Sequence, residues 1–183
     1  TVSHAVAISG DVAVVGAERH PVDGLGNAGQ AYVFTRDPDT DTWSETVILN
    51  SPTPAASDAF GYSVAIDGEV IAVGAYLDDH PAPSSGSIFV YEPVNGAWQN
   101  TGHLVASDGI GGEVLGRDVD VEADTIVGGA FLDSVGVFGA GSLYVFGKRG
   151  SEWQEVRKLV SDAPKGNDRL GHGVAIGGNW IIG

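Results

Sequence analysis

The sequence contains no cysteine among its 183 residues, so it forms neither disulfide bonds nor thiolate metal sites. This absence excludes two kinds of cross-link but does not by itself identify the cellular compartment. Long hydrophobic runs are also missing. No apolar stretch approaches the roughly 18 residues that a membrane-spanning helix needs, so we expect no membrane span in this segment.

Basic residues are scarce. Lys and Arg total 9 against 24 Asp and Glu, which gives a formal net charge of −15. Nucleic-acid binding requires a basic surface, so we expect no nucleic-acid partner. Lysine occurs only three times, and Asp outnumbers Glu 16 to 8. Two interpretations remain open, an ordinary soluble acidic surface and an adaptation to high salt.

Motifs of catalytic and metal sites are missing as well. The five histidines show no metal-ligand spacing such as HExxH, and no GxSxG sequence marks a serine nucleophile. The glycine-rich residues 109–112 are not followed by a helix or by the Gly-Lys-Ser/Thr of a phosphate loop. The sequence therefore predicts no catalytic residue, no resident metal and no cofactor in this chain.

What the sequence does contain is a repeat. The residues FGYSVAIDGEVIAVGAY at 60–76 recur in related form at 115–131, begin again at 170, and have a weaker copy at 2–18. Two landmarks keep a spacing of 55 residues. They are the glycines Gly61, Gly116 and Gly171, and the tryptophans Trp43, Trp98 and Trp153. A fixed period of this length indicates a repeat architecture.

Each repeat reads as four strands without helical periodicity. In the second copy, alternating residues 63–66 and apolar residues 70–73 flank Asp67-Gly68, a strong hairpin signal. A loop follows to residue 85, and two further strands are joined by Asn95-Gly96. The third copy has Glu122-Ala123 at the first turn, where we expect a different turn type because alanine tolerates positive φ poorly.

Four antiparallel strands per repeat predict an all-β fold made of β-propeller blades, with a β-solenoid as the alternative. We expect one partial propeller over residues 1–183, with repeats at approximately 1–59, 60–114, 115–169 and a truncated 170–183. These amount to about three and a half blades. Because propellers typically close with about 4–8 blades, the remaining blades are expected in a longer chain.

The residues Phe60-Gly61 and Val73-Gly74-Ala75 resemble the FG-GAP repeat of integrin α-subunit propellers and of prokaryotic surface proteins. The resemblance covers nearly the whole chain. It implies a non-catalytic binding or structural module, in adhesion or in protein or carbohydrate recognition. It also implies an extracellular or cell-surface location.

The resemblance has departures. Leu115 and Leu170 replace the phenylalanine of the motif. Calcium-binding repeats of the family carry an Asp-rich loop between their first two strands, but here most of these connections are two-residue turns. Such turns are too short to surround an ion that takes 6–8 oxygen ligands. The family's calcium is therefore not assigned to any residue of this chain, although the full-length protein can carry such sites elsewhere.

Structural roles are predicted for the recurring tryptophans and glycines. We expect Trp43, Trp98 and Trp153 to be buried between blades rather than to stack on a ligand. The glycines assigned to structural positions are Gly61, Gly116, Gly171, Gly74 and Gly129.

Acidic residues recur in two registers. Asp58, Glu113 and Asp168 lie three residues before the motif glycine, and Asp78 and Asp133 follow the second strand. Structural roles are favoured for them, because Asp accepts hydrogen bonds from loop backbone. The long loops are nevertheless expected to crowd onto one face of the propeller, and loops on a rigid scaffold often carry binding residues. The candidate binding residues on that face are Tyr76, Asp78, Asp79, Phe131, Asp133, Asp58, Glu113 and Asp168.

Two functions follow from these observations. The first is a binding module with a protein or carbohydrate partner. The alternative is the propeller of an extracellular lyase or hydrolase that acts on polysaccharide. That enzyme would need unlike polar residues from several blades to converge at the central channel, which near-identical repeats make less favourable.

Overall fold

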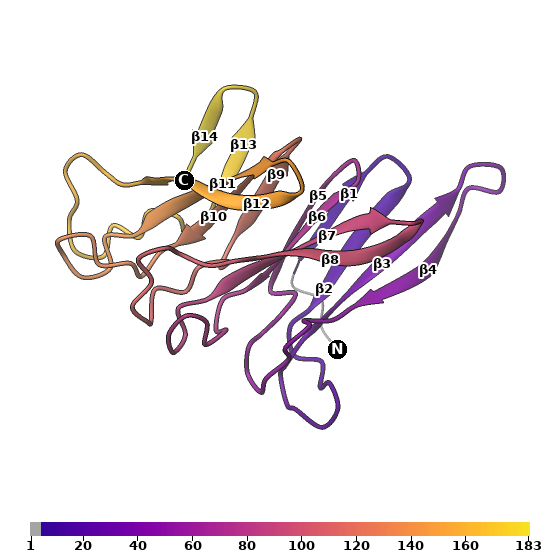
Figure 1. The fold of residues 1–183 in the computed structure, drawn as a ribbon, viewed down its shortest axis with the longest axis horizontal. Helices are drawn as coiled ribbons and strands as arrows, with labels where there is room; N and C mark the ends of the chain where they lie inside the picture. The colour runs from indigo at the N-terminus through magenta and orange to yellow at the C-terminus, as the bar shows by residue number, and fades with distance from the viewer. Residues whose placement is uncertain (1–4) are drawn as a thin grey trace.

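The computed structural model describes residues 5–183, and all of its named elements are β-strands (Figure 1). Three sheets of four antiparallel strands follow one another along the chain, and a two-stranded hairpin comes after the third. The strands are β1 (Val6–Ser9), β2 (Val12–Ala17), β3 (Gln30–Asp37) and β4 (Thr42–Leu49); β5 (Ser63–Asp67), β6 (Val70–Ala75), β7 (Ser87–Val94) and β8 (Ala97–Leu104); β9 (Val119–Glu122), β10 (Thr125–Ala130), β11 (Ser142–Arg149) and β12 (Glu152–Leu159); and β13 (Ala175–Gly177) with β14 (Trp180–Ile182).

Each sheet is a meander in which strands adjacent in sequence are hydrogen-bonded neighbours. The first strands of successive sheets, β1, β5, β9 and β13, lie beside one another, and the sheets fan out from them (Figure 1). The first strands therefore form the inner side of an arc, as expected for blades around an axis. The predicted fold is confirmed as β-propeller blades, three with four strands and one with two.

The FG-GAP glycines are explained by contact between neighbouring blades. A Cβ atom on Gly74 would lie 2.1 Å from the backbone oxygen of Gly116, and one on Gly129 would lie 1.9 Å from that of Gly171. The same contact joins Gly16 to the oxygen of Gly61. Only glycine permits this approach, since a side chain would collide with backbone that cannot move aside. The motif thus fixes the distance between successive blades.

The first hairpin turn of each blade begins one residue later than the sequence suggested. Asp67 still pairs within the sheet, so Gly68 and Glu69 form the turn of the second blade. The expectation of a different turn type in the third blade is wrong, because Ala123 has a φ of 49°, close to the 54° of Gly68. Its backbone N–H donates to Asp67 Oδ2 of the preceding blade at 2.7 Å, which helps to offset the strain of this conformation.

Hydrophobic clusters fill the spaces between blades. One joins the first and second blades and includes Phe60, and another joins the second and third blades and includes Tyr144. A smaller cluster beneath the terminal hairpin includes Val127. Each blade is therefore stabilised mainly by its neighbours, as is usual for repeat proteins.

The three tryptophans differ in burial. Trp153 is only 8% exposed, and Trp98 is partly buried against the first two blades. Trp43 is 41% exposed, so the prediction of a buried Trp43 is corrected. The physical reason is directional, because each tryptophan packs toward the preceding blade. No blade among residues 5–183 lies on that side of β4.

The long connections lie together, opposite the tight turns (Figure 1). The loop between β6 and β7 touches the link to the next blade, because the N–H of Leu115 donates to the carbonyl of Ser85 at 2.8 Å. The equivalent bond joins Leu170 to Ala140 at 2.9 Å. We call this side of the arc, formed by the second connections and the links between blades, the loop face.

Candidate functional site

The first acidic register closes turns within the links between blades. Asp58 Oδ2 accepts the N–H of Ala55 at 2.7 Å, and Glu113 Oε2 accepts that of Ile110 at 3.2 Å. These two acids are only 4% and 5% exposed. Burial raises the pKa of each carboxyl, as expected where solvation is lost. Their burial and their hydrogen bonds favour a structural role for both residues, and their predicted contact with a partner stays a prediction.

Asp78 occupies the second register and is 3% exposed. One carboxylate oxygen accepts from the hydroxyl of Ser87 and faces His103 Nε2 at 3.0 Å, and the other faces His80 Nδ1 at 2.8 Å. Burial alone would raise the pKa of Asp78, but the hydrogen bonds from His103, Ser87 and His80 outweigh it and lower the pKa to about 2. Asp78 thus ties its loop to the strands beneath.

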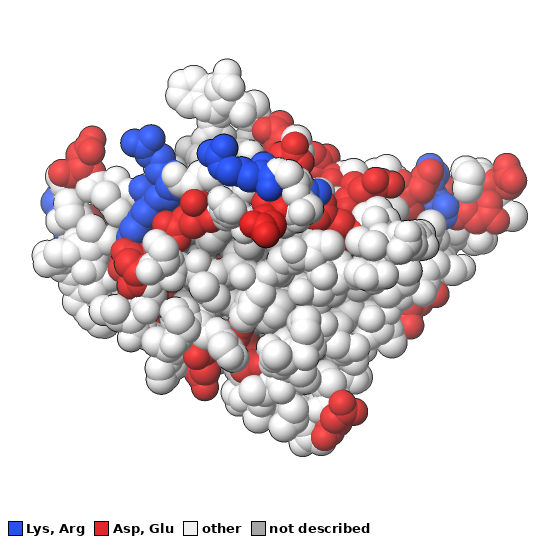
Figure 2. All heavy atoms as spheres, in the orientation of Figure 1, with Lys and Arg blue, Asp and Glu red and all other residues white. Residues whose placement is uncertain are grey.

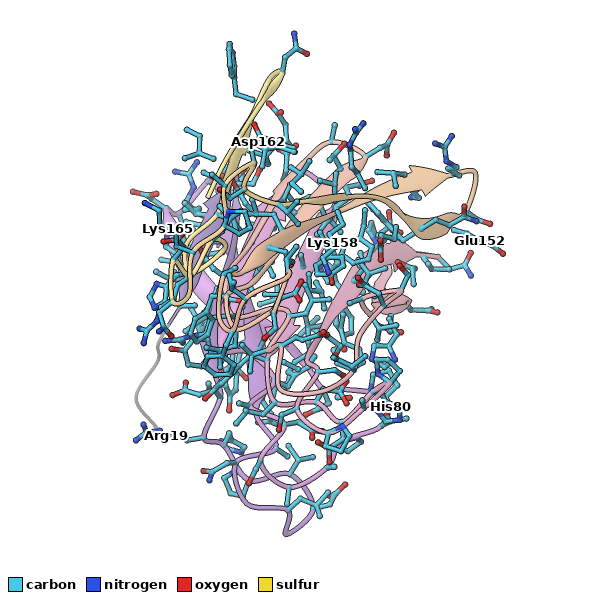
Figure 3. The ribbon with its side chains drawn as sticks, turned by 90° about the vertical axis from the view of Figure 1, so that its left-hand side faces the viewer. Arg19, His80, Glu152, Lys158, Asp162 and Lys165 are labelled. Carbon is cyan, nitrogen blue, oxygen red and sulfur yellow. The ribbon has the colours of Figure 1, made fainter. Side chains whose placement is uncertain are left out.

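Asp133 plays the same part in the third blade and is 4% exposed. It accepts the hydroxyl of Ser142 at 2.6 Å and pairs with Lys158 Nζ at 2.6 Å. Lys158, near the middle of the view in Figure 3, also pairs with Asp108 at 2.7 Å. Burial opposes the charge of Lys158, but the bonds to Asp108 and Asp133 raise its pKa above the usual value. The burial and the partners of Asp78 and Asp133 favour structural roles, and their predicted contact with a partner stays a prediction.

Two predicted acids remain accessible. Asp79 is exposed and accepts the N–H of Ser84 at 2.9 Å, and Asp168 is exposed and accepts the N–H of Lys165 at 2.8 Å. Both lie on the loop face and stay candidates for partner contact. The predicted aromatic residues Tyr76 and Phe131 are partly buried.

The structure reveals a site near the axis that the sequence analysis missed. Tyr62, Arg117 and His172 each follow the first glycine of their repeat, and together they line a hollow of about 520 Å³. The other residues that line the hollow are Ala5, Val6, Ser63, Val64 and Asp118. Residues in the same repeat position thus converge here, because their strands are innermost in the arc.

Arg117 is the centre of an aromatic cluster. Its guanidinium carbon lies 4.2 Å from the ring centroid of Tyr62, 5.5 Å from that of Tyr76 and 5.6 Å from that of Phe131. The Phe131 ring in turn meets His172 edge to face at 5.2 Å. We call these five residues the axial cluster. Such cation–π contacts stabilise the charge without using the N–H donors of the guanidinium.

Those donors face no carboxylate partner in the described part of the chain, since no ion pair of Arg117 occurs within residues 5–183. Burial lowers the pKa of Arg117, and the nearby charge of Asp118 works against this effect. Asp118 itself is occupied, because its Oδ2 accepts the N–H of Val174 at 2.8 Å. Arg117 therefore offers a planar fork of donors beside a hollow, an arrangement suited to an anionic group.

A second hollow of about 350 Å³ adjoins the axial cluster. Tyr62 and Tyr76 form one side of it, and their rings meet at 4.5 Å. The rest of its wall is formed by four polar residues and two apolar ones, namely Glu18, Arg19, Asn27 and Ser57 with Ala59 and Leu77. Because Tyr62 lines both hollows, the two form adjoining parts of one surface near the axis.

One signal in the sequence marks this site. The position after the first motif glycine differs between the repeats, and it carries tyrosine at 62, arginine at 117 and histidine at 172. His4 holds the same position in the first copy but lies outside the described residues. Variation at an inward-facing position indicates a role other than packing.

No group of three or more His, Cys, Asp or Glu side chains that could hold a metal ion occurs within residues 5–183. The same residues include no helix long and apolar enough to cross a membrane.

Comparison with solved structures relates the fold to the crystal structure of the Saccharomyces cerevisiae Sqt1, with a TM-score of 0.51 and 11% sequence identity. The match covers 88% of this chain and 36% of that one, so this chain spans little more than a third of the length of Sqt1. A search of curated proteins finds no match to the sequence. The family model of the FG-GAP repeat matches residues 3–34, 43–91 and 98–146, most of the chain. The protein therefore belongs to the FG-GAP repeat family.

Proposed function

We propose that this chain is part of a non-catalytic binding propeller of a secreted or cell-surface protein, and that its ligand contacts the axial cluster. Membership of the FG-GAP family supports a propeller module of this kind. The observation that carries the choice of site is the convergence of Tyr62, Arg117 and His172 on one hollow. Concave sites with aromatic walls and a few polar groups are typical binding sites.

The loop face supports the same assignment. It presents the exposed Asp79 and Asp168, while the buried acids accept hydrogen bonds within the loops. A rigid scaffold that presents variable residues from several blades can recognise a partner without moving. We therefore assign recognition to the axial cluster and support of the loops to Asp58, Asp78, Glu113 and Asp133.

The test is a selection of ligands followed by a comparison of two variants. Displayed peptides and immobilised glycans are screened against the 183-residue chain, and each ligand is measured again with the double variant Tyr62→Ala, Arg117→Ala. The matched control is Glu69→Ala, Ser151→Ala, which alters the hollow beside the tight turns. We expect loss of binding in the first variant alone. Ligands that bind the first variant normally but fail with the control would place the site on the opposite side.

The enzyme alternative has one observation in its favour, because unlike polar residues do converge near the axis, including Arg117, Asp118 and His172. Glycoside hydrolysis generally uses a pair of carboxylates, whereas Asp118 is the single carboxylate among the residues that line the larger hollow. Release of new chain ends from neutral and acidic polysaccharides measures this activity. Activity that disappears in Asp118→Asn would replace the binding proposal with a catalytic one.

A further inference from the structure

The second hollow lies at the boundary between the first and second blades. Its wall is formed by three segments, namely the loop between β2 and β3, the link from β4 to β5, and the residues directly after β6. Its volume of about 350 Å³ is near the lower end of the roughly 300–1,000 Å³ that is typical of small-molecule sites. The hollow therefore fits one compact unit rather than an extended chain.

Two polar side chains in this wall have hydrogen-bonding capacity that the chain does not use. Asn27 and Ser57 are exposed, and neither side chain forms a hydrogen bond among residues 5–183. Backbone bonds hold their two segments together, because the N–H of Ser57 donates to the carbonyl of Gly26 at 2.9 Å and that of Ala59 to the carbonyl of Asn27 at 3.1 Å. The amide and the hydroxyl are thus held beside the hollow and are available to a ligand.

Comparison of the repeats shows that joining the blades does not require these side chains. The same pair of backbone bonds recurs at the second boundary, from Gly112 to Pro83 at 2.9 Å and from Val114 to Ser84 at 3.3 Å. The third boundary repeats it as well. The positions of Glu18, Arg19, Asn27 and Ser57 are nevertheless taken by Tyr76, Leu77, Ser84 and Gly112 at the second boundary, and by Phe131, Leu132, Gly139 and Asn167 at the third. Only the first of these three boundaries has the full polar set.

The wall of the hollow is balanced in charge. Its two charged residues are Glu18 and Arg19, which are opposite in sign and lie 3.5 Å apart. The Arg19 side chain is 77% exposed, and Figure 3 shows it at the edge of the molecule, so it forms part of the rim. On the face that Figure 2 shows, charged side chains gather over the hairpins in the upper half, and the surface over the long loops in the lower half is mostly uncharged. A neutral ligand matches this wall better than an ion.

A sugar residue has the required chemistry. Each of its hydroxyl groups both donates and accepts a hydrogen bond, as do the amide of Asn27 and the hydroxyl of Ser57. Its C–H groups suit the rings of Tyr62 and Tyr76, which form the aromatic part of the wall. Peptides are usually recognised along a free strand edge or an extended groove, whereas this hollow is compact and walled by loop segments.

We propose that the second hollow binds one neutral sugar residue of a glycan, with Asn27 and Ser57 bonded to its hydroxyl groups and Tyr62 and Tyr76 against its C–H groups. This inference rests on the proposed function, because Tyr62 belongs to both the hollow and the axial cluster. It commits to a glycan as the ligand, and a peptide becomes an outcome of the test.

The probe is a set of immobilised neutral oligosaccharides that differ in their terminal sugar, with uronate-ended counterparts, measured by surface plasmon resonance on the 183-residue chain. The double variant Asn27→Gly, Ser57→Gly removes both side chains, and glycine accepts the φ values of 54° and 75° at these positions. We expect a neutral oligosaccharide to bind, and this variant to bind it about tenfold more weakly or worse, as the loss of two hydrogen bonds predicts. Asn27→Asp should weaken binding too, because it removes the amide donors.

The matched control is Ser84→Gly, Asn167→Gly. It deletes the same two kinds of side chain at equivalent positions of the later boundaries, where φ is 50° and 62°. It should bind like the unmodified chain, and far-ultraviolet circular dichroism establishes that each variant is folded. Binding of none of the neutral oligosaccharides, or an equal loss in the control, overturns the inference. Stronger binding of the uronate-ended counterparts overturns the choice of a neutral sugar.

Two further outcomes separate this inference from the proposed function. Ligands of the wider screen that need Tyr62 and Arg117 but bind the Asn27→Gly, Ser57→Gly variant normally overturn the sugar site and leave the proposed function standing. The same holds if peptides, and no glycans, are the ligands that this variant loses. A sugar that needs Asn27 and Ser57 but binds Tyr62→Ala, Arg117→Ala normally supports the sugar site and overturns the assignment of recognition to the axial cluster.

Discussion

Trp153 and Trp43 hold the same position in their repeats but have different surroundings. Trp153 Nε1 donates to Glu92 Oε2 of the preceding blade at 3.2 Å, and its ring lies against Gly102. Trp43 extends from the outer side of the first blade and is 41% exposed. The contribution of each tryptophan to stability therefore depends on the blade that it packs against. The sequence of one repeat does not reveal whether that blade is present.

Replacement of the two tryptophans should therefore have unequal effects on stability. Trp153→Ala removes a buried aromatic side chain and should lower the free energy of unfolding by about 3–5 kcal/mol. Trp43→Ala should cost much less in the same chain, because less surface leaves a packed environment. Urea unfolding of both variants measures the difference. Equal losses would show that the inter-blade contact of Trp153 contributes little.

The sequence of one repeat does not show its neighbouring blade, which explains what could and could not be predicted at single positions. The repeat spacing located the glycines whose backbones touch between blades, because Gly74 and Gly129 tolerate no side chain. It could not tell whether the carboxylate of Asp78 points into its own loop or into solvent, since both choices leave the same pattern. Arg117 was missed because its partners Tyr76 and Phe131 come from two different repeats.

At the scale of elements, the loop after the second strand is fastened differently in each blade. The second blade uses Asp78 with His80 and His103, while the first has His20 in the position of Asp78, where it lies 3.4 Å from the Tyr32 hydroxyl. Figure 3 shows His80 at the loop end of the molecule and Glu152 at the tip of the hairpin between β11 and β12. The third blade pairs Asp133 with Lys158, whereas the second pairs its carboxylate with two histidines. The attachment of the loop in the second blade should therefore respond to pH near the ordinary pKa of histidine.

The hydrogen bond and charge of Asp78 raise the pKa of His80, with smaller contributions from Asp58 and Asp79, while partial burial opposes the rise. A raised folded-state pKa means that the stabilisation is fully present below the unfolded value of 6.5 and is lost as the pH rises through the folded value. Asp78, with a pKa of about 2 against 3.8, stabilises above 3.8 and loses this effect as the pH falls toward 2. Stability should therefore be greatest between about pH 4 and 6.

The variant His80→Gln tests the expected loss of stability as the pH rises above 6. Its urea midpoint should change less between pH 6 and 8 than that of the unmodified chain, because the titrating partner of Asp78 is gone. His20→Gln is the control, because it removes a histidine from the equivalent loop of the first blade, where the ring faces the Tyr32 hydroxyl rather than a carboxylate. Parallel pH profiles for His80→Gln and the unmodified chain would contradict the role of this pair.

The whole molecule is an arc of blades whose end surfaces are apolar. Val6 and Ile8 on the first blade are 71% and 62% exposed, and Trp180 and Ile182 on the terminal hairpin are 77% and 69% exposed. These strands present inter-blade surfaces without a blade against them among residues 5–183. Such exposed apolar surfaces favour association with other β-sheets.

Charge acts on the same scale and gives the last prediction. A net charge of −15 produces repulsion that opposes the compact state, and salt screens it because the Debye length falls from about 10 Å at 0.1 M to about 3 Å at 1 M. The melting temperature should therefore rise from low to molar sodium chloride.

In a variant with Asp23, Glu45 and Asp162 changed to their amides, the rise in melting temperature should be smaller. The side chains of these three acids are exposed and form no hydrogen bond or ion pair among residues 5–183, so the change to amides alters charge and little else. A melting temperature that is flat with salt, or an equal rise in the variant, would show that the acidic surface serves solubility and not stability in salt.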